Sequence, residues 1–125
     1  MAGGAHDPHY LGYFECFNRE QFYEAHDVLE ELWLECRKQP DDLFFKGLIQ
    51  LAGAFVHLQK SRLKPANVLF GLAEANLKPY APLHRDLSVT EILALITDWR
   101  NRLVSNRFAS NPLSYSPPPR LHLVN

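Results

Sequence analysis

Apolar residues recur every three or four positions along most of this chain, the spacing that gathers them on one face of an α-helix. No stretch shows the strict alternation that a half-buried β-strand requires. We therefore expect an all-α protein, a compact bundle of about five helices that forms a single domain over residues 7–104. The pattern places the helices at residues 8–17, 22–38, 43–59, 65–78 and 89–104.

Capping residues mark several of these helix ends. Asp7, followed by a proline, and Ser88, followed by a glutamate three residues later, are both favoured helix starts. Asp41 and Asp42 offer caps for the third helix. Beyond the last helix, asparagines, serines and three consecutive prolines predict an extended or disordered tail over residues 105–125.

The third predicted helix is apolar around roughly half its circumference or more, which is typical of a helix at the centre of a bundle. Its polar positions fall in one seam. This seam contains Gln50 and His57, which share a face of the helix. Between them, Gly53 would allow a neighbouring helix to approach closely.

The second predicted helix carries a polar pair at the edge of its apolar face. His26 and Glu30 are four residues apart, so their side chains can meet, and both lie beside Trp33. A polar side chain that is half withdrawn from water needs a partner. Asp27, in contrast, falls on the solvent-facing side of the helix.

These two helices could bring their polar residues together. If they pack antiparallel and seam to seam, one pocket holds the candidate ligand-binding residues His26, Glu30, Gln50 and His57, with Trp33 as a wall. The two imidazoles and the carboxylate (His26, His57 and Glu30) suffice for a divalent metal with an open coordination position. The same groups could perform acid–base chemistry without a metal, because histidine titrates near neutrality.

Each candidate also has a structural interpretation. His26 and Glu30 can be a hydrogen-bonded pair that fixes helix packing, because buried polar groups normally find partners. His57 can lie on the single wet face of a buried helix, and Trp33 can belong to the core. The sequence leaves both sets of interpretations open.

Composition narrows the class of protein. A formal net charge of −1 argues against duplex DNA binding, which depends on neutralising phosphates. The longest apolar-rich run without charge is too short to cross a bilayer, and the N-terminal residues lack a signal-peptide pattern. Two cysteines make no disulfide framework. We expect a cytoplasmic protein that neither spans a membrane nor binds nucleic acid.

Two segments resemble a known family. FNREQFYEAHDVLEELW and FFKGLIQLAGAFVHLQ are similar to the bacterial and archaeal family catalogued as domain of unknown function 309, over about residues 10–77. The positions that carry the resemblance are Phe17, Asn18, His26, Glu30, Trp33, Gly47, Leu48, Ile49, Gln50 and His57. The resemblance implies a compact all-α domain and picks out the same polar residues. It implies no activity, because the family is itself uncharacterised.

Two functional hypotheses follow. The first is a small helical domain whose internal polar site binds a metal ion or a small polar ligand, with hydrolytic chemistry as a further option. The second is a structural or protein-interaction module in which the pair of His26 and Glu30 only locks helix packing. A protein partner or a homo-oligomer is compatible with either hypothesis.

Overall fold

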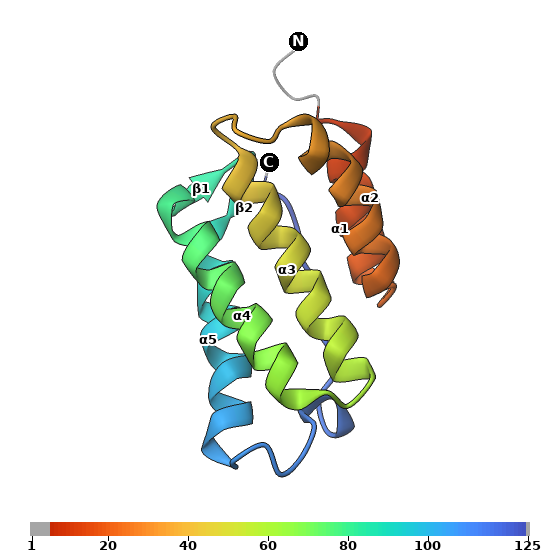
Figure 1. Cartoon of the computed structure of the whole chain (residues 1–125), viewed down its shortest axis with the longest axis vertical. Coiled ribbons are helices and arrows are strands. Elements are labelled where there is room, and N and C mark those ends of the chain that lie inside the picture. Colours follow the sequence, from red (N-terminus) through yellow and green to blue (C-terminus); the bar gives the residue numbers. More distant parts are fainter. Residues whose placement is uncertain (1–5, 125) are drawn as a thin grey trace.

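The computed structural model describes residues 6–124 and confirms the expected all-α bundle (Figure 1). The helices in this part of the chain are α1 (Pro8–Asn18), α2 (Phe22–Glu35), α3 (Asp42–Gln59), α4 (Leu63–Leu77) and α5 (Val89–Ser105). Short 3-10 turns follow α4 and α5 as η1 (Lys78–Tyr80) and η2 (Pro112–Ser114). None of these helices is both long enough and apolar enough to cross a membrane.

The helix ends follow the local capping signals in part. Asp7 caps α1 by accepting a hydrogen bond from the amide two residues later (2.7 Å), and Ser88 caps α5 by accepting one from the amide three residues later (3.2 Å). The second helix ends at Glu35, earlier than predicted. The reason is that Lys38 adopts a left-handed conformation (φ 66°) and donates its amide to the Asp42 carboxylate (2.8 Å). The side chain of Asp42, at the start of α3, thus holds the backbone that follows α2 in a non-helical conformation.

The centre of the bundle is α3. In Figure 1 it stands between α4 and α2, with α1 packed against α2 and α5 packed against α4. Phe55, on α3, is fully buried and contacts an aromatic ring from each of the other four helices. Its ring centroid lies 5.0–5.6 Å from those of Phe17, Phe22, Phe70 and Trp99. One side chain thus connects all five helices.

Of the two glycines on α3, Gly47 is packed more tightly against α4. A Cβ atom at this position would lie 2.7 Å from Cγ of Leu77, which is fully buried, and 3.4 Å from the backbone oxygen of Ala73. Gly53, singled out in the sequence, has more room, since its Cβ would lie 3.1 Å from Leu69. The close approach that the sequence placed at Gly53 is therefore tightest two turns earlier.

A small antiparallel hairpin, β1 (Leu83–His84) and β2 (Leu87–Ser88), precedes α5 and was not predicted. Its two-residue turn, Arg85–Asp86, has left-handed backbone at both positions (φ 47° and 62°). Such turns strongly favour Asn and Gly, so this one is held by distant contacts. The Tyr10 hydroxyl donates to the carbonyl of Arg85 (3.0 Å), and the Val124 amide donates to that of Asp86 (2.7 Å).

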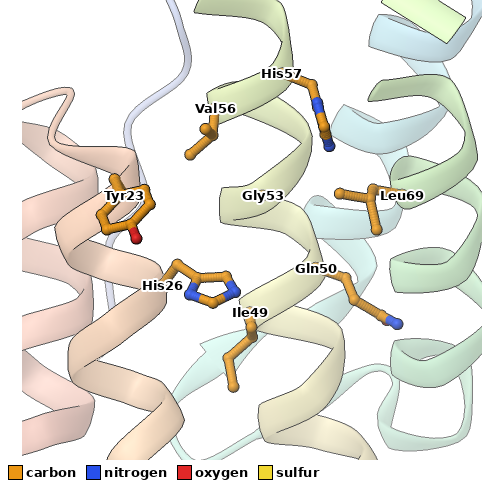
Figure 2. Close-up of a pocket in the computed structure, with 8 residues that line it drawn as sticks. All are labelled: Tyr23, His26, Ile49, Gln50, Gly53, Val56, His57 and Leu69. Atoms are coloured by element: carbon orange, nitrogen blue, oxygen red, sulfur yellow. The ribbon is translucent and has the colours of Figure 1, made fainter. Parts of the chain in front are cut away.

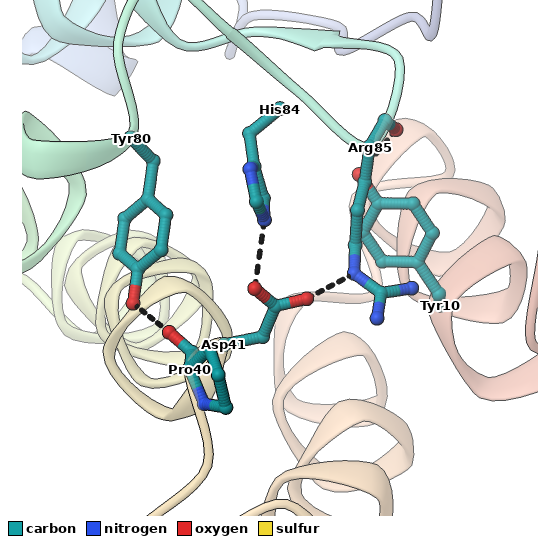
Figure 3. Close-up of polar contacts among 6 residues, drawn as sticks. All are labelled: Tyr10, Pro40, Asp41, Tyr80, His84 and Arg85. Atoms are coloured by element: carbon teal, nitrogen blue, oxygen red, sulfur yellow. Dashed lines mark hydrogen bonds and ion pairs between the residues drawn. The ribbon is translucent and has the colours of Figure 1, made fainter.

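Asp41 connects this hairpin to the start of α3 (Figure 3). Its carboxylate accepts hydrogen bonds from Nε2 of His84 (2.8 Å) and from Nε of Arg85, while the Tyr80 hydroxyl donates to the carbonyl of Pro40 (2.6 Å). Burial by itself would raise the pKa of Asp41, but the hydrogen bonds from Arg85 and His84 outweigh it and hold the pKa below its usual value. Asp41 occupies the N-cap position of α3, yet its side chain makes no capping hydrogen bond.

After η2, the chain returns along the bundle to the hairpin. We call residues 115–124 the strap. Figure 1 shows this segment passing behind α3 towards β1 and β2. Most of the strap is exposed or half-buried, but the side chain of Leu121 is buried, with 3% of its surface exposed.

Replacing Gly47 by alanine tests the close packing of α3 and α4. Because the new methyl group would collide with the fully buried side chain of Leu77, we expect a loss of about 1–3 kcal/mol in the free energy of unfolding. Urea unfolding measures this. The matched control is Gly12→Ala on α1, where the nearest atom to the new methyl group is 3.5 Å away. That change should stabilise the protein by about 0.5–1 kcal/mol, and a similar loss in both variants would contradict the packing argument.

The substitution Asp41→Asn tests the connection between the hairpin and α3. Because the pKa of Asp41 is depressed in the folded chain, its carboxylate stabilises the fold above the pKa of the unfolded chain. That stability is lost as the pH falls through the folded pKa. We expect the variant to be less stable by about 1–2 kcal/mol at pH 7, with a difference that shrinks towards zero below about pH 4.

Urea unfolding at a series of pH values between 7 and 3 follows this difference. The control is Asp98→Asn, which removes an exposed carboxylate paired with Arg102 (2.8 Å) on the same helix. Exposed pairs of this kind contribute less than about 0.5 kcal/mol. A pH-independent deficit in Asp41→Asn would show that the charge of this residue is not what holds the hairpin.

Candidate functional site

The outer face of α3 forms a groove between α2 and α4 (Figure 2). We call it the α3 groove, and its volume is about 220 Å³. It is lined by Tyr23 and His26 of α2, by Leu69 of α4, and by Ile49, Gln50, Gly53, Val56 and His57 of α3. The groove exists because α2 and α4 flank α3 on opposite sides and leave its polar seam uncovered.

The floor of the α3 groove is apolar. Ile49 and Gly53 are buried, while Val56 and Leu69 are half-buried. The spacing of four and three residues between Ile49, Gly53 and Val56 places these three positions on the face of α3 that the neighbouring helices leave open. An apolar lining with a few polar groups is the usual composition of a small-molecule site.

The polar groups of the seam are Gln50 and His57. The side-chain oxygen of Gln50 accepts a hydrogen bond from Nδ2 of Asn76 on α4 (2.7 Å), which fixes the amide at one edge of the groove. In Figure 2 the ring of His57 lies further along α3, on the side of Leu69. These two residues therefore mark the α4 side of the groove.

His57 has no structural partner for one of its ring nitrogens. Its Nδ1 is buried and makes no hydrogen bond to any described residue. Burial, and then the positive charges of Arg62 and Lys60, lower the pKa of His57 below its ordinary value, so the ring is neutral at neutral pH. A neutral imidazole carries one donor and one acceptor nitrogen. No described residue makes a hydrogen bond to Nδ1 that would fix whether this nitrogen is the donor or the acceptor. In a histidine that serves helix packing, such a hydrogen bond is expected.

His26 lies on the opposite wall of the α3 groove. Figure 2 shows its ring extending from α2 over Ile49. The ring of Tyr23, of which 61% is exposed, lies nearly parallel to it at a centroid distance of 6.4 Å and an angle of 26°. Nδ1 of His26 is paired with the carboxylate of its neighbour Asp27 (3.1 Å). His26 is thus held within its own helix rather than by α3.

A cluster of potential metal ligands occurs on α2. His26, Asp27 and Glu30 each offer one ligand atom, and these atoms lie within 4.8 Å of one another. His57 is not part of this cluster, so the metal set predicted from the sequence is not gathered at one point. Asp27, which the helical pattern assigned to the solvent-facing side, is exposed and belongs to this cluster because its carboxylate pairs with Nδ1 of His26 (3.1 Å).

Two of the five predicted binding residues do not line the α3 groove. Glu30 is half-buried and belongs only to the cluster on α2. Trp33 donates its indole N–H to the carboxylate of Asp42 (2.7 Å), and the guanidinium of Arg37 lies over its ring (5.5 Å). Trp33 therefore lies outside the α3 groove, and its hydrogen bond fastens the connection between α2 and α3.

The sequence analysis did not identify several residues of the α3 groove and of the contacts between the hairpin and α3. Tyr23 and Leu69 line the α3 groove, and Asp41 connects His84 to Arg85 at the hairpin. Tyr23 is one turn before His26, a spacing that could have indicated a shared face. No local signal indicates Leu69 or the partners of Asp41, because both depend on how distant elements pack.

Comparison with known proteins gives a family and no function. Residues 10–69 match the family model described as "Domain of unknown function (DUF309)". This span contains every residue that lines the α3 groove. No curated protein and no solved structure matches the chain. Residues 10–69 are thus similar to this family of domains of unknown function, as the resemblance in the sequence predicted.

Proposed function

We propose that this chain is a ligand-binding domain that holds a small, partly apolar molecule in the α3 groove. The observation that carries the proposal is the convergence of His26, Gln50 and His57, from two helices, on a groove with an apolar floor. The Nδ1 atom of His57 makes no hydrogen bond to the described residues, so no contact there fixes the tautomer of the ring. The other ring nitrogen can therefore donate a hydrogen bond to a ligand or accept one from it.

The size and lining of the groove limit the ligand. A cavity of about 150 Å³ accommodates benzene, so a groove of about 220 Å³ has room for a single substituted ring. The apolar floor favours a flat hydrocarbon body that can also contact the parallel rings of Tyr23 and His26. The imidazole of His57 and the amide of Gln50 would then pair with one polar substituent.

The packing hypothesis for His26 has less support. A histidine that locks two helices together would be buried and bonded across the interface. The side chain of His26 is instead 35% exposed, and its hydrogen bond is to the adjacent Asp27. This arrangement leaves the ring available to a ligand.

A second candidate function is binding of a divalent cation by His26, Asp27 and Glu30. The observation that favours it is the mutual approach of their ligand atoms to within 4.8 Å. One imidazole and two carboxylates suit zinc or another divalent transition metal and leave coordination positions open. Because His26 also lines the α3 groove, a cation there would lie at the edge of the ligand site.

Single-ring probes test the leading proposal. We expect phenol, benzamide or indole to shift the amide resonances of Gly53 and its neighbours in ¹H–¹⁵N NMR spectra, with saturation as the probe concentration rises. The substitution Val56→Trp should abolish these shifts because the indole fills the groove. Leu11→Trp, at an exposed position of α1, is the matched control and should leave them unchanged. Equal binding to both variants would exclude the α3 groove as the site.

Zinc titration tests the second candidate. We expect His26→Ala and Glu30→Ala each to weaken zinc binding at least tenfold in calorimetry, while His122→Ala, an exposed histidine of the strap, leaves it unchanged. Both variants should keep the free energy of unfolding to within about 0.5 kcal/mol, because they remove partly exposed groups. A loss of 1 kcal/mol or more would favour the packing role instead. Unchanged zinc binding in both would reject the metal site.

A further inference from the structure

The strap ends in a cradle formed by the end of α1, the hairpin and the start of α5. Asn18, the last residue of α1, holds one strap residue by its backbone. Nδ2 of Asn18 donates to the carbonyl of Leu121 (2.8 Å), and the amide of Leu121 donates to Oδ1 of Asn18 (2.7 Å). A side-chain amide presents a donor and an acceptor side by side, as a β-strand does. Asn18 therefore recognises an extended backbone, whatever its side chain.

Two alternate leucines of the strap face the bundle. Leu121 is buried, with 3% of its surface exposed, and Leu123 packs against the core while forming an antiparallel bridge with Leu87 of β2. The intervening His122 points to solvent, as the alternation of an extended strand requires. The strap thus lies along the edge of the hairpin as an additional strand. Adding a strand to a sheet edge is a common way in which proteins bind extended peptides. The pattern that the cradle recognises is Leu-x-Leu.

The rest of the strap makes few buried contacts with the bundle. A space of about 500 Å³ lies between the part of the chain around Pro117 and the ends of α1–α3, and one of about 200 Å³ lies between Arg120–Val124 and α5. Tyr115 is 60% exposed, and the three prolines that follow have no amide to donate. Few buried contacts and exposed hydrogen bonds are the marks of a segment that opens locally, without global unfolding.

We propose that the cradle is a peptide-binding site for an extended Leu-x-Leu segment, which the strap fills in cis and which the strap of a second copy of this chain fills in trans. A second copy of the chain carries the same strap, whose fit to the cradle the structure shows. Its Leu121 and Leu123 would therefore make the same contacts with Asn18 and Leu87. Exchange of identical elements is a low-cost route to a dimer. The three prolines favour an extended spacer that would carry a released strap away from its own bundle.

A labelled peptide tests the cradle directly. The probe is a fluorescein-labelled peptide of residues 115–125, and its binding is followed by fluorescence anisotropy. The receptor is the full chain with Leu121→Glu, whose own strap can no longer bury its anchor. We expect saturable binding to this variant. Binding to the unmodified chain should be at least about tenfold weaker, because its tethered strap competes at a high effective concentration.

The matched control places Asn18→Asp in the same Leu121→Glu background. This change keeps the size of the side chain but replaces the Nδ2 donor with an oxygen that repels the carbonyl of Leu121. We expect peptide binding to be lost. Equal binding with Asn18 or Asp at this position, or no binding to the Leu121→Glu chain, would overturn the proposal. A peptide with Glu at position 121 should not bind to any of these chains.

Hydrogen exchange on the unmodified chain gives a test that requires no variant. If the strap opens locally, the amides of Leu121 and Val124 should exchange at least tenfold faster than the buried amides of α3 around Phe55. Equal protection would show that the strap leaves the cradle only on global unfolding and would overturn the proposal.

Sedimentation at increasing concentration tests the second copy as the occupant. A reversible dimer that is absent in the Leu121→Glu chain supports exchange of the strap. The opposite result would be peptide binding by the Leu121→Glu chain but no dimer of the unmodified chain, even at millimolar concentration. This result would overturn the second copy as the occupant of the cradle and would indicate a segment of another protein instead.

Discussion

The burial of α3 around Phe55 is the constraint on which the rest of the structure depends. Because the ring of Phe55 contacts one aromatic ring from each of the other four helices, each of them must bring that ring to the C-terminal part of α3. Aromatic pairs with edge-to-face geometry add to the burial of their large surfaces. At Gly47 the absence of a side chain lets α4 come close enough for this arrangement. A single helix therefore organises the bundle.

The same constraint creates the candidate site. The helices that pack against α3 leave one of its faces uncovered, and this face carries Gln50 and His57. The opposite face of α3 is packed in the core. The α3 groove thus combines an apolar floor with a few polar side chains, the property that supports a ligand-binding role.

Short polar side chains hold the parts of the chain that are not helical. Asp41 binds His84 and Arg85 of the hairpin, Asn18 binds the backbone of Leu121, and Asn111 donates to the carbonyl of Leu58 at the end of α3. Asp and Asn commonly make local hydrogen bonds at helix ends. Asp41 and Asn18 instead bind segments that are far away in the sequence. These hydrogen bonds join the hairpin and the strap to the bundle.

The sequence by itself determined the helices, their apolar faces and the polar seam of α3, because helical periodicity and capping residues act over a few neighbouring positions. It also placed His26, Gln50 and His57 on facing helices, which the structure brings to one groove. Only the tertiary structure decided that Trp33 pairs with Asp42, that His57 lies apart from His26 and Glu30, and that the strap lies against Asn18. These outcomes depend on crossing angles and on contacts between distant residues, which no local pattern encodes.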